Sequence, residues 1–224
     1  QIINNKNFKI SKYHTKINNF SQIKFFDDNN FYQSKGKVIS ALNLAFLTYN
    51  HKYKLRTHNY EFWPDGIFAK ILTNKNKIAG RYFIKKILVK LNKRKVFDNI
   101  YILGNLNTNT KDWINKNLER DYIFKKLPYG ETKTILTSIR NIKIKKKSLV
   151  ILTLPTPKQE IIGNEILKKS VDALIICIGG SLNILSGSEK PVPQILHKLY
   201  LEWLWRLRFD TKRRFLRLGE TFTI

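Results

Sequence analysis

Two short segments in the last third of the chain combine glycine, proline and polar side chains in a way that suits ligand binding. Pro157-Lys158-Gln159-Glu160 and Ile178-Gly179-Gly180-Ser181 each come at the end of an apolar, strand-like run. An open α/β sheet places its ligand site where such strands end. Lys158 and Gln159 can reach an anionic or polyhydroxyl ligand, and Glu160 suits the positive end of a helix dipole. The first segment alone also fits an ordinary helix start with surface charges.

A third segment of the same kind is Leu103-Gly104-Asn105, which ends the apolar run Ile100–Leu103 and precedes a predicted helix. A glycine at this place lets a phosphate approach the backbone, and the helix N-terminus favours the anion. The alternative is a tight turn between a strand and a helix. No G-x-G-x-x-G or Walker sequence is present, so neither a dinucleotide site nor an ATPase is indicated. Together, two glycine turns at one sheet edge predict a single crevice.

Asp65 is the candidate for proton transfer. It lies between Pro64 and Gly66, after the aromatic pair Phe62-Trp63. A carboxylate on a tight turn at a sheet edge can accept a proton from a substrate hydroxyl. Pro-Asp-Gly is also a common turn sequence, so a purely structural role is the alternative.

The C-terminal tail is basic and aromatic. Trp203 and Trp205 lie among leucines, and the arginines include Arg206, Arg213 and Arg214. Such a segment suits an anionic membrane surface, and arginine forks onto phosphate oxygens. The alternative is an amphipathic helix packed on the core. The apolar runs of the chain are shorter than the roughly 18 residues that a spanning helix needs.

The charge balance limits the partners. There are 42 Lys+Arg against 16 Asp+Glu, a net charge of +26, which attracts nucleic acid, phosphorylated substrates or anionic lipid. Compositional drift is an equally good account of the scattered lysines. The four histidines and the one cysteine, Cys177, form no metal-ligand spacing, so we expect neither a metal site nor a cofactor.

Apolar strands alternate with helical patterns along the chain. The predicted strands are Lys37–Leu42, Ile100–Leu103, Tyr122–Leu127, Leu149–Leu152 and Ala173–Ile178. The predicted helices are a short one after Gly66 over 67–72, then Gly80–Lys93, Thr108–Leu118 (capped by Thr108 or Thr110), Glu131–Ile142, Lys158–Lys169 and Gln194–Phe209. This order predicts an α/β fold with a mainly parallel sheet and helices on both faces. We expect a catalytic domain over 1–188 and a helical, basic appendage over 189–224.

Taken together, these segments resemble the WecG/TagA/CpsF family of bacterial glycosyltransferases. The resemblance rests on Leu154–Glu160, Gly179–Gly187 and Leu201–Leu207, with Pro64–Ile67 matching an upstream motif. It implies a Rossmann-like α/β core and a metal-independent, inverting transfer from a UDP-sugar to a sugar on an undecaprenyl-diphosphate lipid. It also implies a peripheral position on the inner face of the cytoplasmic membrane. The oligomeric state and the two sugars stay open, with N-acetylmannosamine-type sugars and hexoses as donor candidates.

The resemblance also implies residue roles. Asp65 becomes the base, with Asn43 near the reaction centre. The nucleotide-sugar is expected to meet Gly104, Asn105, Lys158, Gln159, Glu160, Gly179, Gly180 and Ser181. The diphosphates are expected to meet Lys77, Arg81, Arg206, Arg213 and Arg214.

The chain departs from the family pattern at Ala41, where the family has threonine, at Lys77, where it has arginine, at Tyr82, where it has an acid, and at Pro155, where it has glycine. These departures leave a catalytically degenerate scaffold as one alternative. The net charge leaves a nucleic-acid-binding module as another. However, the sequence contains no nucleic-acid-binding motif, so we do not expect nucleic acid as a partner.

Overall fold

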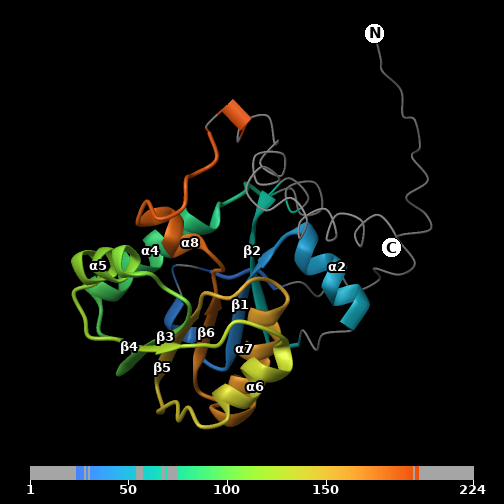
Figure 1. Cartoon of the computed structure of the whole chain (residues 1–224), viewed down its shortest axis with the longest axis vertical. Helices are drawn as coiled ribbons and strands as arrows, with labels where there is room; N and C mark the ends of the chain where they lie inside the picture. The colour runs from blue at the N-terminus through green and yellow to red at the C-terminus, as the bar shows by residue number, and fades with distance from the viewer. Residues whose placement is uncertain are drawn as a thin grey trace.

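A parallel β-sheet forms the centre of the molecule (Figure 1). The computed structural model of the chain describes residues 24–27, 29, 31–53, 58–66, 69, 75–193 and 195–196. Within these residues six strands pair in the order β2-β1-β6-β5-β3-β4, and every neighbouring pair is parallel. The strands are β1 (Lys37–Leu42), β2 (Tyr60–Pro64), β3 (Asn99–Gly104), β4 (Ile123–Lys126), β5 (Ser148–Leu152) and β6 (Leu174–Cys177).

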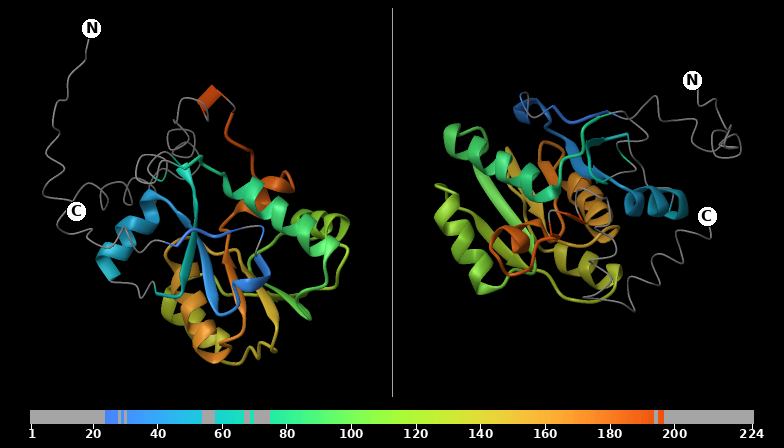
Figure 2. Two further views of the ribbon diagram at one scale, coloured as in Figure 1. Left: turned by 180° about the vertical axis from the view of Figure 1, so that it is seen from behind. Right: turned by 90° about the horizontal axis from the view of Figure 1, so that it is seen from above.

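Helices cover both faces of this sheet, as the right-hand view of Figure 2 shows. One apolar core lies under α4, α5 and α8, and the other lies under α2, α6 and α7. The predicted α/β, Rossmann-like class is therefore confirmed. The helical elements are η2 (Phe31–Gln33), α2 (Leu44–Tyr53), α4 (Gly80–Lys93), α5 (Thr108–Asn117), α6 (Thr132–Ile139), α7 (Lys158–Lys169) and α8 (Ser181–Leu185).

The direction of each crossover connection determines which face of the sheet its helix covers. Connections from β2 to β3 and from β3 to β4 move one way along the sheet, and they carry α4 and α5. Those from β1 to β2, from β4 to β5 and from β5 to β6 move the other way, and they carry α2, α6 and α7. Because crossovers between parallel strands are right-handed, the two directions place their helices on opposite faces.

The predicted strand Lys37–Leu42 and the predicted helices Gly80–Lys93 and Lys158–Lys169 have the bounds that the structure shows, and the other predicted strands and helices among the described residues shift by one to three residues at their ends. The central strands β5 and β6 are buried along their whole length, which is why they read as unbroken apolar runs. The stretch after β1, where the sequence pattern predicted neither a strand nor a helix, contains α2 and β2. The predicted cap of α5 is wrong: Asn107 caps it, because its Oδ1 accepts from the N–H of Thr110 at 2.8 Å.

Two predictions concern parts of the chain that are mostly undescribed. Of the helix predicted after Gly66, only Ala69 lies within the described residues. Of the helix predicted over Gln194–Phe209, only Ile195 and Leu196 do, and both are helical. The division into a catalytic domain over 1–188 and an appendage over 189–224 stays a prediction. Among the described residues no helix has both the length and the hydropathy to cross a bilayer.

Candidate active site

Asp65 and Asn43 lie side by side because they follow neighbouring parallel strands. In the register of β1 and β2, Leu42 is opposite Pro64, so each strand ends one residue before a polar side chain. The N–H of Asp65 donates to the carbonyl oxygen of Leu42 at 3.1 Å. The amide Nδ2 of Asn43 donates to Oδ2 of Asp65 at 3.4 Å. The structure thus brings together the two residues predicted at the reaction centre.

Asn43 is held from its other side as well. Its Oδ1 accepts a hydrogen bond from the N–H of Phe46 at 2.9 Å, in the first turn of α2. An asparagine in this place caps the helix and fixes its own amide plane, which directs Nδ2 toward the carboxylate. Both Asn43 and Asp65 are half-buried. Gly66, with φ of +80°, provides the sharp turn that follows.

Glu160 lies in the interior, where three donors converge on one of its oxygens. Its Oε1 accepts from Ser40 Oγ at 2.8 Å, from Gln159 Nε2 at 3.0 Å and from Thr156 Oγ1 at 3.1 Å. The residue is fully buried, and Oε2 has no partner among the described residues. Burial raises the pKa of the Glu160 carboxyl, and the hydrogen bond from Ser40 opposes that rise in part.

The Glu160 network extends to the glycine turn through Gln159. Besides donating to Glu160, Gln159 accepts from the N–H of Gly179 through Oε1 at 2.9 Å. Gln159 is only 4% exposed. Both side chains were predicted to contact the nucleotide-sugar. In this structure they bond within the protein, so they set the position of the turn, and a ligand contact stays a prediction.

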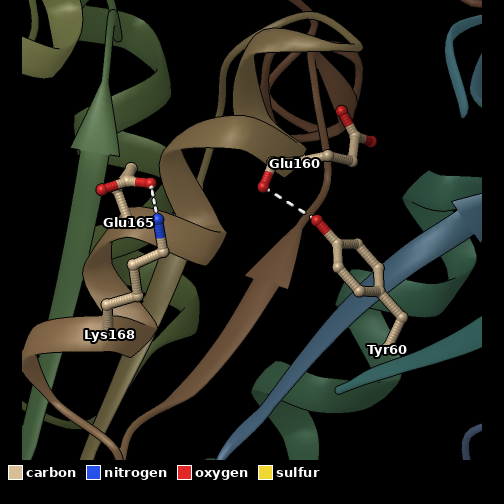
Figure 3. Close-up of polar contacts among 4 residues, drawn as sticks. All are labelled: Tyr60, Glu160, Glu165 and Lys168. Carbon is tan, nitrogen blue, oxygen red and sulfur yellow. Dashed lines mark hydrogen bonds and ion pairs between the residues drawn. The ribbon is translucent and has the colours of Figure 1, made fainter. Parts of the chain in front are cut away.

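Tyr60 connects β2, the first strand in the order of the sheet, to the segment that contains Glu160 (Figure 3). Its hydroxyl donates to the backbone carbonyl oxygen of Glu160 at 2.8 Å. The tyrosine is buried, and burial raises the pKa of its hydroxyl. Figure 3 also shows the ion pair between Lys168 and Glu165 further along α7, on the exposed side of that helix.

Around the turn after β6, each predicted residue has a local contact. Gly179 has φ of +55°, a conformation that favours glycine. Gly180 is exposed, and a Cβ there would lie 3.4 Å from Oε2 of Glu189. Ser181 is buried, and its Oγ donates to the carbonyl oxygen of Ile178 at 2.7 Å. The N–H groups of Gly179 and Ser181 are both bonded inside the protein.

Gly104 makes room for a neighbouring side chain. It has φ of +145°, and a Cβ added there would lie 3.2 Å from the Cβ of Thr153 and still nearer to its hydroxyl oxygen. This packing fits the tight-turn alternative, and a contact of Gly104 with the nucleotide-sugar stays a prediction. Asn105, the next residue, is half-buried, and its Oδ1 has no hydrogen-bond partner among the described residues.

The basic residues predicted at this edge come from two directions. Lys158 begins α7, and its Nζ donates to the carbonyl oxygen of Gly130. Lys77 precedes Ile78, whose N–H donates to the carbonyl oxygen of Pro64 at 2.7 Å, next to Asp65. Arg81 is in the first turn of α4, with its guanidinium 4.7 Å from the ring centre of Tyr82. Arg206, Arg213 and Arg214 lie outside the described residues.

The sheet order gives the arrangement along the edge. From β2 onward, the strand ends present Asp65, Asn43, Gly179-Gly180, Thr153 and Gly104-Asn105. Neighbouring strands are about 4.8 Å apart, so the carboxylate and the Gly179 turn are about 10 Å apart along the edge. No group of three or more His, Cys, Asp or Glu side chains gathers among the described residues.

Sequence reasoning missed four residues that hold this site. Ser40 and Thr156 donate to Glu160, Tyr60 anchors its backbone, and Thr153 fills the space at Gly104. Ser40 carried a usable signal, because it is a polar residue in the middle of β1, between apolar neighbours. A buried polar side chain in a central strand requires a partner.

A protein family matches this chain over most of its length, and individual relatives match it over about a third. The family described as "Glycosyl transferase WecG/TagA/CpsF family" matches residues 28–223. Proteins from Staphylococcus aureus strains NCTC 8325 / PS 47 and COL are 34% identical over 79 residues, which is 34% of this chain. A protein from strain MRSA252 is 33% identical over the same length.

All three relatives are named N-acetylglucosaminyldiphosphoundecaprenol N-acetyl-beta-D-mannosaminyltransferase. The chain spans 30% of the length of these curated relatives. The family match, by contrast, covers well over half of the chain and includes both polar strand ends and the glycine turns. This protein therefore belongs to the WecG/TagA/CpsF family of glycosyl transferases.

Proposed function

We propose that this protein transfers a sugar from a UDP-sugar to a sugar on an undecaprenyl-diphosphate lipid, with Asp65 as the general base. The observation that carries the proposal is the contact between Asn43 and Asp65 at the edge of the sheet where the Gly179 turn also lies. The family membership and the names of the relatives support the reaction class. By the same analogy, the donor sugar is N-acetylmannosamine and the acceptor sugar is N-acetylglucosamine.

The proposed step is a single displacement with inversion. The acceptor hydroxyl oxygen attacks the anomeric carbon, and Asp65 takes the hydroxyl proton. The bond between the anomeric carbon and the diphosphate oxygen breaks, and its electron pair leaves with UDP. Asn43 holds the Asp65 carboxylate in position by donating a hydrogen bond to Oδ2.

The charge that develops on UDP needs cations and N–H donors near the break. Lys77 and Arg81 lie on the segment that bonds to the end of β2, close to Asp65. The orphan Oδ1 of Asn105 is an acceptor suited to a hydroxyl of the nucleotide ribose. Arg206, Arg213 and Arg214 belong to the proposal by resemblance only. The protein would then work as a peripheral protein at the inner face of the cytoplasmic membrane.

The test is a donor screen with a matched pair of variants. Purified protein is given UDP-sugars and a short lipid-diphosphate-sugar analogue, and released UDP is measured. Asp65→Asn should lower transfer by about 10²–10⁴-fold while UDP-sugar affinity is largely kept, because only the proton acceptor is lost. The control is Asp172→Asn, an exposed aspartate at the opposite edge of the sheet.

Two results would count against the proposal. Transfer at the normal rate by Asp65→Asn would remove Asp65 as the base. An absence of UDP release with every donor would favour the alternative of a catalytically degenerate scaffold.

A further inference from the structure

The outward face of α4 is a concentrated cationic surface on the described part of the chain. A hollow of about 620 Å³ lies along this helix, and none of the described residues that line it is acidic. Four exposed or half-buried lysines and an arginine contribute to it: Lys85, Lys86, Lys90, Lys93 and Arg94.

The same face carries two exposed apolar side chains. Tyr82 is 54% exposed and Val89 is 46% exposed. With Lys85, Lys86 and Lys93 they fall at i, i+3, i+4, i+7 and i+11, which is one stripe of a helix. An aromatic ring and an aliphatic side chain between lysines are what a helix lying in a lipid headgroup region presents.

The orientation of α4 is fixed, so this stripe stays on the outside of the protein. Its opposite face is locked in the core by Phe83, Ile84, Ile87, Leu88 and Leu91, all at most 3% exposed. Figure 2 shows α4 on the outside of the sheet. The cationic stripe is thus a fixed feature of the folded core and not a flexible basic arm.

The first turn of α4 is joined to the candidate active site. A Cβ on Gly80 would lie 2.5 Å from the hydroxyl oxygen of Ser181, so the helix start packs directly on the Gly179–Ser181 turn. Just before the helix, Ile78 bonds to the end of β2 next to Asp65. The outward face of α4 therefore begins beside the candidate active site, at the first turn of the helix.

We propose that the outward face of α4 docks on an anionic phospholipid surface and holds the sheet edge against the membrane. The occupant follows from the charge of the face, from the exposed Tyr82 and Val89 between its lysines, and from its rigid junction with the site. The choice of a membrane over another polyanion rests on the proposed function, in which the acceptor is a lipid. These lysines belong to a different part of the sequence from the arginines of the C-terminal tail.

The test compares two triple variants of the full chain with equal charge. One is Lys85→Gln/Lys86→Gln/Lys93→Gln on α4. The control is Lys143→Gln/Lys145→Gln/Lys146→Gln in the exposed loop before β5, at the opposite edge of the sheet. Partition onto vesicles of phosphatidylglycerol and phosphatidylcholine is measured by sedimentation. At about fivefold per lysine, the α4 variant should bind about a hundredfold more weakly, and the control should stay within a few-fold of the wild type.

A site-specific probe gives an independent reading. The single native cysteine, Cys177, is buried, so an introduced cysteine can be labelled selectively. A polarity-sensitive fluorophore on Val89→Cys should shift to the blue when phosphatidylglycerol vesicles are added. The same label on Lys145→Cys should not shift.

Several outcomes would overturn the proposal. Equal loss of vesicle binding in both triple variants would mean that binding depends on the net charge of the protein and not on the outward face of α4. An α4 variant that loses oligonucleotide binding but keeps vesicle binding would assign the face to nucleic acid. Because vesicle binding needs no turnover, the docking result stands apart from the donor screen. With a water-soluble acceptor the α4 variant should keep the wild-type rate, and with a vesicle-embedded acceptor it should lose rate in proportion to binding.

Discussion

Replacement of Gly104 by alanine tests the geometry at the end of β3 directly. The added Cβ would lie 3.2 Å from the Cβ of Thr153 and closer to its hydroxyl oxygen, so the neighbour would have to move. The φ of +145° at this position adds a second cost, because side chains rarely adopt it. Both effects raise the free energy of the folded state.

Gly130→Ala separates the two effects. Gly130 has φ of +132°, yet an added Cβ there meets nothing within 4 Å. Its replacement should therefore cost only the backbone term, roughly 1–3 kcal/mol. Gly104→Ala should cost a similar backbone term and in addition about 1–3 kcal/mol for overpacking.

Urea unfolding measures this difference. We expect Gly104→Ala to be less stable than Gly130→Ala by about 1–3 kcal/mol. Thr153→Ala removes the hydroxyl group, so the double variant Gly104→Ala/Thr153→Ala should recover most of that difference. Equal losses of stability for the two single alanine variants, or no recovery in the double variant, would refute the close approach of Thr153 to Gly104.

Three further predictions follow from contacts at the site. Folding raises the pKa of the Glu160 carboxyl above its ordinary value of 4.5. The free energy of unfolding therefore falls as the pH rises from 4.5 to the pKa of the folded state, and it levels off above that pH. Glu160→Gln should remove that fall. Its free energy of unfolding relative to the wild type, measured by urea unfolding, should therefore rise with pH by at most about 1.4 kcal/mol per pH unit. A difference that does not change with pH would contradict this prediction. Asn43→Asp keeps an oxygen for the α2 cap but sets a second carboxylate beside Asp65. The acid limb of its rate profile should move up by about 1–2 pH units, and an unmoved limb would mean that Asn43 does not act on the base. Phe83→Ala loses the ring stacked on Trp63 at 4.0 Å and should lower the free energy of unfolding by about 3–5 kcal/mol, against little change for Tyr82→Ala on the exposed face.

Much of the fold follows from hydrophobic patterning. The apolar stripe of α4 and the unbroken apolar runs of β5 and β6 reflect burial on one face and on two faces respectively. The segment 44–60 did not reveal α2 and β2, because asparagine, tyrosine and lysine there mask a weak periodicity. These elements are defined by tertiary contacts such as Phe46 against Phe62.

The site could be predicted at the level of the strand ends but not of the side chains. The ends of parallel strands meet at one edge, so Asp65, Asn43 and Gly179 come together wherever the strand order is right. The order itself, with β6 next to β1, depends on long-range pairing that no local pattern encodes. For the same reason the inward direction of Glu160 was not foreseen, since its partner Ser40 is 120 residues away.

The two borders of the sheet are protected differently. At one border, Phe25 bridges to Phe62 and extends the pairing past β2. At the other, β4 has only four residues and ends in the exposed Lys125 and Lys126. Charged, short borders resist strand addition by another chain. Under the proposed attachment to a lipid surface, where copies of the protein would meet often, these two lysines would disfavour pairing of β4 with the sheet of a second copy.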